Sequence, residues 1–431
     1  MDVKLAYGRT GLTVSLPDNT DIVAAPSLPG VANPAIALLE AIRNPIGSPP
    51  LAELVKPGDR VVIVHSDITR PTPNDVIMPV LLAELETAGV RREDITLLNG
   101  LGTHRAQTEA EMRALLGDSV YDNYRCMQHN AFDDSVLVSL GETSNGQPLR
   151  VNRLLVESDV RILTGFIEPH LFAGYSGGPK AVLPALCGQE SVLTNHGREM
   201  IAHPNATWGI CEGNPIWEEM REAALKTDPT FILNVTLNED KKITAVFAGD
   251  MLRAHKAGRD FVRKQAMVAV DEPYDIVITT NSGFPLDQNL YQTVKGMSAA
   301  VRIVREGGHI IMAAACEDGI PDHGRYLELL VDAGSPQGFL DMLAQPGFAE
   351  QDQWQVQIQA LIQLKAEVHV FSENLSDEQI RSALFTPCND ITETVNRLAE
   401  KIGPGPFDKL RTGVRICTMP EGPQTIAYIH A

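Results

Sequence analysis

The stretch EPHLFAGYSGGPKAVLPALCGQESVLTNHG, from Glu168 to Gly197, combines residue types that can do chemistry. A glycine-rich turn leads to Lys180, and His170 and His196 lie near the two ends of the stretch. Backbone N–H groups in such a turn can bind a phosphate, and imidazoles can bind a metal or move a proton. The stretch is therefore a candidate phosphate-binding loop, a candidate metal site, or a buried turn that contains a lysine.

The turn departs from the Walker pattern G-x-x-x-x-G-K-[ST] of nucleoside triphosphatases. Residues 174–181 read G-Y-S-G-G-P-K-A, so Pro179 replaces the last glycine and Ala181 replaces the hydroxyl that would bind magnesium. We therefore do not expect a nucleoside triphosphatase. The glycines can still cradle a single phosphate, and a tight turn with a solvated lysine explains the pattern equally well. Pro179 restricts the backbone directly before Lys180, which favours a fixed lysine.

A second candidate set consists of the histidines His104, His170 and His196. Their spacing matches neither HExxH nor another local metal motif, so the sequence supports a three-histidine zinc site only weakly. Histidine is the natural general base near neutral pH, and one on each side of a substrate would suit a reaction that handles both stereoisomers. A lone histidine is more often structural, and that alternative stays open for each of the three.

Two basic residues, Arg70 and Lys295, are candidate anchors for an anionic substrate. An arginine guanidinium can bind a carboxylate through two parallel hydrogen bonds. For either residue alone, a salt bridge or a solvated side chain is the commoner outcome.

The elements that must position these residues are predicted from apolar, β-branched runs that alternate with helical patterns. Strands are expected at 61–65, Asp94–Gly100, Asp159–Ile167, Tyr274–Gly283, Gly308–Cys316, Ala366–Ser372 and in the C-terminal TIAYIHA. A helix is expected over Asn74–Ala88, and Thr108 with Glu111 has the spacing of a capping box. Continuous apolar strands between helices indicate an α/β fold with mainly parallel sheets flanked by helices.

Polar residues gather beyond the ends of these strands, where open parallel sheets bind ligands. In strand order they are Asp67 and Arg70, His104, His170, and Gln292 with Lys295. Because they come from both halves of the chain, they predict an active site in a cleft between two domains.

The bulk properties of the chain agree with two domains in a reducing compartment. The chain has 431 residues, more than one ordinary core holds, and we expect an N-terminal α/β domain over 1–270 and a smaller one over 271–431. A net charge of −19 argues against nucleic acid or an anionic membrane as partner. The six cysteines are scattered and the N-terminus lacks a signal-peptide pattern, so we expect a cytoplasmic protein. Gly403–Gly413 reads as a surface loop.

Several of these motifs together resemble the nickel-dependent lactate racemase family. The matching segments are SDITRPTP, GTHR, GFIEPHLFAGYSGGPKAVLP, TNHG and LDQNLYQTVKGM, and the likeness covers nearly the whole chain. The resemblance implies a 2-hydroxyacid racemase or epimerase that carries nickel in a pincer nucleotide, a pyridinium-3-thioamide-5-thiocarboxylic acid mononucleotide. It also implies that cofactor-biosynthesis enzymes are partners. The oligomeric state and the identity of the 2-hydroxy acid stay open, with lactate as the default.

The resemblance further implies a role for each candidate residue. Lys180 would tether the cofactor covalently, His196 would bind nickel, and His104 with His170 would take and return the substrate hydroxyl proton. Polar positions around substrate and cofactor would be Asp67, Arg70, Gln292 and Lys295. Cofactor contacts would come from Gly174, Ser176, Gly177, Gly178 and Trp354.

The implied chemistry is physically reasonable, because removing a proton from C2 beside a carboxylate would create a costly dianionic enolate. Hydride transfer to a pyridinium ring instead leaves a flat keto acid that can be reduced on either face. Two alternatives remain: a zinc hydrolase that uses His104, His170 and His196, and a non-catalytic protein that binds small carboxylates through Arg70 and Lys295.

Overall fold

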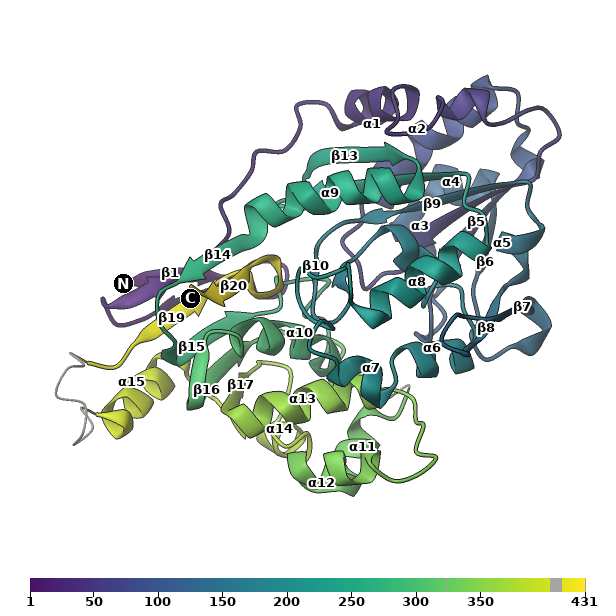
Figure 1. Ribbon diagram of the computed structural model, residues 1–431. Helices are drawn as coiled ribbons and strands as arrows, with labels where there is room; N and C mark the ends of the chain where they lie inside the picture. Colours follow the sequence, from purple (N-terminus) through teal and green to yellow (C-terminus); the bar gives the residue numbers. More distant parts are fainter. Residues whose placement is uncertain (323, 404–412, 431) are drawn as a thin grey trace. The chain divides into compact units, whose positions relative to one another are not determined.

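The computed structural model describes residues 1–322, 324–403 and 413–430. Residue contacts divide the chain into two compact units, which Figure 1 shows as ribbons. The N-terminal unit is Ser27–His196 with Ala202–Lys264, and the C-terminal unit is Met1–Pro26, Gly197–Ile201 and Gln265–Ala431. Residues 404–412 of the predicted surface loop lie outside the described residues.

The N-terminal unit contains a six-stranded sheet in the order β13-β12-β9-β4-β5-β6. Its strands are β4 (Val61–Ser66), β5 (Ile95–Gly100), β6 (Arg125–Gln128), β9 (Val160–Phe166), β12 (Phe231–Leu237) and β13 (Ile243–Gly249). All neighbours pair in parallel except β12 and β13, which are antiparallel. The predicted strands at 61–65, Asp94–Gly100 and Asp159–Ile167 are confirmed.

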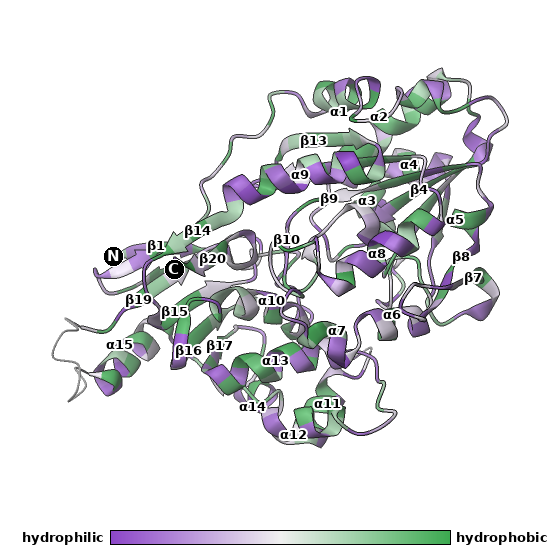
Figure 2. Cartoon of the chain, viewed as in Figure 1, coloured by the Kyte–Doolittle hydropathy of each residue, from purple (hydrophilic) through white to green (hydrophobic). Residues whose placement is uncertain are grey.

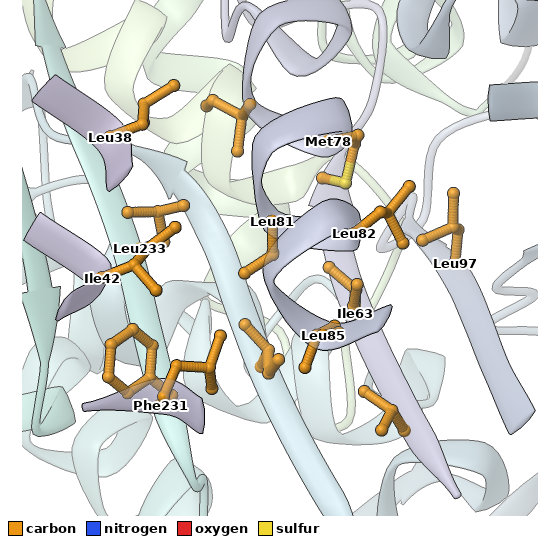
Figure 3. Packing of buried hydrophobic residues seen from close by; sticks show 14 of the residues in the cluster. Leu38, Ile42, Ile63, Met78, Leu81, Leu82, Leu85, Leu97, Phe231 and Leu233 are labelled. Atoms are coloured by element: carbon orange, nitrogen blue, oxygen red, sulfur yellow. The ribbon is translucent and has the colours of Figure 1, made fainter. Parts of the chain in front are cut away.

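Helices connect the strands of this unit, and several of them bury apolar side chains in one core with the sheet. They are α1 (Pro34–Arg43), α2 (Asn74–Thr87), α3 (Glu109–Leu116), α4 (Asp118–Asn123), α5 (Arg153–Glu157), α6 (Gln189–Asn195), α8 (Pro215–Lys226) and α9 (Met251–Ala266). Figure 3 shows Leu38 and Ile42 of α1 and Leu81 of α2 packing with Ile63 of β4 and Phe231 of β12. Burial of such side chains contributes roughly 1.5–3 kcal/mol each, which makes this core a rigid base for the loops at the strand ends.

Two local predictions for helices of this unit are confirmed. The helix expected over Asn74–Ala88 is α2, which ends one residue earlier than predicted. The capping box precedes α3: the Thr108 side chain accepts from the Glu111 N–H, and the Glu111 side chain accepts from the Thr108 N–H.

The C-terminal unit contains a second six-stranded sheet, in the order β18-β17-β16-β15-β19-β3, in which all neighbours are parallel. Its strands are β3 (Thr20–Ile22), β15 (Tyr274–Thr280), β16 (Val304–Ala313), β17 (Ala366–Phe371), β18 (Thr386–Pro387) and β19 (Ile416–Met419). Since β3 pairs with β19, the first residues of the chain belong to this unit. The predicted division at residue 270 stays a prediction, as does the cleft.

Helices also surround the second sheet. They are α10 (Leu290–Ala300), α11 (Tyr326–Ala333), α12 (Pro336–Leu343), α13 (Gln353–Lys365), α14 (Asp377–Ser382) and α15 (Ile391–Ile402), and α7 (Arg198–Ala202) is a short helix at the unit boundary. Figure 2 shows hydrophobic and hydrophilic residues alternating along α15, which buries Ile391, Val395 and Leu398.

The remaining strands form small two-stranded sheets. The pairs are β1 (Asp2–Leu5) with β2 (Leu12–Ser15), β7 (Leu137–Glu142) with β8 (Pro148–Asn152), β10 (Pro169–His170) with β11 (Gly174–Tyr175), and β14 (Met267–Val270) with β20 (Ile426–Ile429). The strand predicted in TIAYIHA is confirmed as β20. The predicted α/β class with parallel sheets flanked by helices is confirmed.

All six cysteines lie within the described residues, and none of them forms a disulfide. Of the helices in the described part of the chain, none combines the length and the apolar character needed to cross a bilayer.

Candidate active site

Asp67 and His104 form a hydrogen-bonded pair in the N-terminal unit. Asp67 follows the carboxyl end of β4 and His104 follows that of β5, so the parallel pairing of these strands brings the two side chains together. Nδ1 of His104 lies 2.6 Å from Oδ2 of Asp67, while the N–H and hydroxyl of Thr69 donate to Oδ1. With its Nδ1 proton donated to the carboxylate, neutral His104 can accept a proton only at Nε2.

The Asp67 carboxyl is ionised although it is buried. Burial alone would raise the pKa of Asp67, but the charge and hydrogen bond of His104, helped by Thr69 and Arg70, hold it below its ordinary value. A carboxylate in this position orients the imidazole and leaves Nε2 of His104 as its second polar atom.

Arg70 lies near Glu168, the residue two positions after the end of β9. Nη1 of Arg70 is 3.8 Å from Oε1 of Glu168, close enough for attraction between the charges but too far for a hydrogen bond. Nη1 is buried, and no described residue accepts a hydrogen bond from it. Because a buried donor without an acceptor costs free energy, this guanidinium is well suited to bind an anion such as a carboxylate.

His170 is held in a tight hairpin formed by β10 and β11, in which it pairs with Gly174. The backbone N–H groups of Phe172 and Ala173 point to Nδ1 of His170 at 3.5 and 3.2 Å. Nδ1 is thus an acceptor, so neutral His170 carries its proton on Nε2. His104 and His170 therefore have opposite tautomers, one with a free lone pair on Nε2 and one with a proton there.

The glycine turn that precedes Lys180 is fixed by contacts which leave no room for side chains. Gly177 and Gly178 have φ angles of 77° and 52°, a region that favours glycine. The N–H of Gly178 donates to Asn234 Oδ1 of β12 at 2.8 Å, and a Cβ added to Gly178 would lie 2.5 Å from Cγ of His255. Nε2 of His255 in turn lies 2.9 Å from the carbonyl oxygen of Ser176, so the turn is held from both sides.

Two further cofactor-contact candidates, Gly174 and Ser176, take part in the same arrangement. The Ser176 hydroxyl donates to the Phe166 carbonyl and accepts from the Glu168 N–H, both at 2.9 Å, so it ties the turn to the end of β9. Gly174 has a φ of 77°, and a Cβ there would collide with the Ile210 carbonyl. These contacts fix the backbone of the glycine turn that precedes Lys180.

Lys180 lies in a setting that makes its amine far less basic than usual. Burial is the largest cause, the positive charge of Arg70 adds to it and Glu168 opposes it, and together they lower the pKa of Lys180 to about 7. A large fraction of the side chain is therefore the neutral, nucleophilic amine at neutral pH.

His196, at the end of α6, is neutral for a related reason. Burial and then the charge of Lys180 lower the pKa of His196 well below its ordinary value. The Phe172 ring makes edge contacts with both imidazoles, at centroid distances of 4.6 Å to His170 and 4.9 Å to His196, and Nζ of Lys180 is 5.8 Å from the same ring. One aromatic ring thus gathers the lysine and two of the three predicted histidines.

The remaining candidates lie in the C-terminal unit, at the start of the helices α10 and α13. Nζ of Lys295 donates to Oε1 of Gln292, one turn earlier on α10, at 2.5 Å. Nε1 of Trp354 on α13 donates to the hydroxyl of Tyr291 at 2.9 Å. The helix α13 packs against α10, which follows the carboxyl end of β15.

The three predicted histidines do not form a metal site of their own. In the part of the chain that the structure describes, His104, His170 and His196 do not form a group of three whose ligand atoms all lie within 4.8 Å of one another. A zinc ion needs its ligand atoms closer together than this set brings them. The geometric basis for a three-histidine zinc hydrolase is therefore absent.

Comparison with known proteins relates the whole chain to one family. Residues 7–209 match the family model of the lactate racemase N-terminal domain, and residues 269–417 match that of the lactate racemase C-terminal domain. A lactate racemase of Thermoanaerobacterium thermosaccharolyticum is 36% identical over 407 residues, which cover 93% of this chain and 95% of that protein. The chain belongs to the lactate racemase family. It is therefore an enzyme of the isomerase class.

Other lactate racemase sequences and structures agree. The lactate racemase of Lactiplantibacillus plantarum is 38% identical over 386 residues, covering 89% of this chain and 88% of that protein. The structure of the lactate racemase apoprotein from T. thermosaccharolyticum superimposes with a TM-score of 0.88 at 34% identity, covering 99% of this chain and 100% of the other. A Thermotoga maritima protein shares the fold, with a TM-score of 0.70 at 19% identity over 92% and 98% of the chains.

In this member of the lactate racemase family, the structure adds residues that the sequence analysis missed. Glu168 and Phe172 lie within the segment that carries His170, yet only their contacts reveal that they affect Lys180 and the histidines. Asn234 and His255 lie far along the chain from the glycine turn that they hold. The position of Glu168 directly after a strand was the one available sequence signal.

Proposed function

We propose that the chain racemises lactate or a related 2-hydroxy acid by using a nickel-pincer nucleotide attached to Lys180. The observation that carries this proposal is the Lys180 amine, whose pKa is lowered to about 7 at the end of a fixed glycine turn. A neutral amine is required to form an amide-type bond, and an ordinary lysine supplies very little of it at neutral pH.

The residues around Lys180 fit such a group. His196 is buried and neutral, which is the form of imidazole that binds a metal ion. The turn residues Gly174, Ser176, Gly177 and Gly178 would lie along the cofactor, and Trp354 would be a further contact. When bound, the group would accept a hydride from C2 of the substrate and return it.

The other residues would handle the substrate itself. Arg70, with a buried Nη1 that lacks an acceptor among the described residues, would bind the substrate carboxylate. His104, oriented by Asp67, would take the hydroxyl proton at Nε2, and His170 would hold the hydroxyl or keto oxygen through its Nε2 proton. Gln292 and Lys295 would add polar contacts.

Two imidazoles with opposite tautomers suit a reaction that runs in both directions. For either enantiomer, His104 would take the hydroxyl proton at Nε2 and return it to the keto oxygen when the hydride comes back. His170 would donate a hydrogen bond from Nε2 to that oxygen and keep its proton, because its Nδ1 accepts backbone N–H groups. Each direction therefore uses both His104 and His170, and replacing either one with alanine is expected to abolish racemisation of both enantiomers.

Intact-mass measurement tests the attachment. The protein is produced together with the enzymes that build the cofactor, which are the partners that the proposal requires, and compared with Lys180→Ala and with Lys56→Ala, an exposed lysine. We expect a covalent mass increase in the wild type and Lys56→Ala, and none in Lys180→Ala. Active wild-type protein of unmodified mass would refute the attachment.

A panel of enantiopure 2-hydroxy acids, analysed by chiral chromatography, identifies the substrate. Turnover of one member into its mirror image by loaded enzyme would support the proposal, and saturable binding without turnover would favour the carboxylate-binding alternative. The cytoplasmic location, inferred from the cysteine pattern, remains part of the proposal.

A further inference from the structure

Three side chains with metal-binding atoms converge on one face of the sheet in the C-terminal unit. Glu367 and His369 lie two positions apart on β17, so they point to the same side, and His309 is the neighbour of Glu367 on β16. Within the described residues, this is the one group of three His, Cys, Asp or Glu side chains whose ligand atoms all lie within 4.8 Å of one another. Neither the sequence motifs nor the proposed racemisation uses these residues.

The distances within the cluster match those of a tetrahedral metal site. Nε2 of His369 is 3.3 Å from Nδ1 of His309, and the Glu367 carboxylate oxygens are 3.5 Å from the His309 nitrogen and 3.7 Å from the His369 nitrogen. Ligand atoms about 2.0–2.2 Å from a tetrahedral zinc ion are about 3.3–3.6 Å from one another. We propose that His309, Glu367 and His369 bind one zinc ion in the C-terminal unit.

The surroundings of the cluster support this assignment. His369 is almost completely buried, whereas the Glu367 side chain is 47% exposed, so one side of the cluster remains open for a water molecule as fourth ligand. The hydroxyl of Thr386 donates to Oε1 of Glu367 at 3.2 Å and so orients the carboxylate. Because Thr386 belongs to β18, a bound ion would connect three neighbouring strands of the sheet.

Cations near the cluster would weaken the attraction of a dication. They are Arg305, Arg397 and Lys401. Since Lys401 is exposed near the end of α15, Lys401→Ala is expected to preserve the fold and to tighten zinc binding roughly twofold to fivefold.

Zinc titration of the full chain tests the site, with protein made without the cofactor-building enzymes and stripped of metal by a chelator. Binding of ZnCl₂ is followed by competition with a chromophoric chelator, and the thermal midpoint is measured with and without zinc. Glu367→Gln is the test variant, because it keeps the size of an exposed side chain and removes its charge. His430→Ala is the matched control, because it removes an exposed histidine outside the cluster.

We expect the wild type and His430→Ala to bind one more zinc ion per chain than Glu367→Gln, or to bind it at least about tenfold more tightly. Zinc should raise the thermal midpoint of the first two proteins and not that of Glu367→Gln, since an ion that binds only the folded chain stabilises it. Cobalt in place of zinc should give the visible absorption of a tetrahedral site.

Equal zinc stoichiometry and affinity in the wild type and Glu367→Gln would overturn the proposal. The 3.3 Å contact would then be a hydrogen bond between two neutral imidazoles. Zinc bound elsewhere, including at His104, His170 or His196, is the same in both proteins and cancels in the comparison. The outcome is independent of whether Lys180 carries a cofactor.

Discussion

The lowered basicity of Lys180 leads to a prediction that needs neither cofactor nor substrate. An amine with a pKa of about 7 is about half neutral at pH 7, whereas one with an ordinary pKa near 10.4 is neutral in about four molecules of ten thousand. The neutral fraction of Lys180 thus exceeds that of an ordinary lysine by about a thousandfold, and it should be nearly complete by pH 8.5.

Competitive labelling with a trace of acetic anhydride measures this titration. Lys180 keeps part of its surface exposed, so a small reagent can reach it. Unloaded protein is labelled at a series of pH values, and mass spectrometry of peptides compares Lys180 with the exposed Lys56. The labelling of Lys180 should rise to a plateau with a midpoint near pH 7. The midpoint is the readout, because burial slows access without changing the pH at which the amine loses its proton.

Two substitutions should move this midpoint in opposite directions. Arg70 lowers the pKa of Lys180 and Glu168 raises it, so Arg70→Gln should shift the midpoint upward and Glu168→Gln should shift it downward, each by about one unit. A wild-type midpoint above about pH 9, or shifts of both variants in the same direction, would refute the electrostatic reasoning and with it the argument for a nucleophilic amine.

Three other substitutions test neighbouring parts of the structure. Asp67→Asn should lower kcat of loaded enzyme by about 10²–10⁴-fold, because His104 loses the carboxylate that orients it. The circular dichroism spectrum should stay unchanged, and a loss of kcat below tenfold would contradict this role. Gly178→Ala should reduce the covalent mass increase of protein that is produced together with the cofactor-building enzymes, because the new Cβ meets His255 and the left-handed turn must shift. Full modification of this variant would show that the turn geometry is not required for attachment. Thr108→Ala should cost about 1 kcal/mol of unfolding free energy in urea denaturation, through loss of the cap of α3, with no change in kcat.

Much of the fold could be predicted from the sequence, because the central strands are long apolar runs bounded by turns. The predicted strands at 61–65, Asp159–Ile167 and Tyr274–Gly283 correspond to β4, β9 and β15 within a few residues. The pairing of β3 with β19 could not be predicted, since it joins a three-residue strand to one that lies almost 400 residues later. Short strands of this kind carry too little local signal, and their pairing depends on the sheet that already exists.

The sequence predicted those parts of the candidate site that the order of parallel strands alone brings together. Residues that follow neighbouring parallel strands must come close together, and this explains the contact between Asp67 and His104. The protonation states were not predictable, because they depend on which atoms face each imidazole. The structure reveals that backbone N–H groups point to Nδ1 of His170, whereas a carboxylate faces Nδ1 of His104.

In the proposed function, the cluster around Lys180 must meet two electrostatic demands. Arg70 would have to be positive to bind an anionic substrate, and Lys180 would have to be neutral to attach the cofactor. In the unmodified chain, the charge of Arg70 helps to keep Lys180 neutral, but a protonated Lys180 would compete with Arg70 for any bound carboxylate. An amide-type bond removes the charge of Lys180 permanently. After attachment, the guanidinium of Arg70 would be the cation of this cluster that fixes the substrate. It interacts with the charge of the ionised Asp67 and lies 3.8 Å from Glu168. Covalent tethering would therefore do more than retain the cofactor, because it would also leave a single positive anchor and so one orientation for the substrate carboxylate.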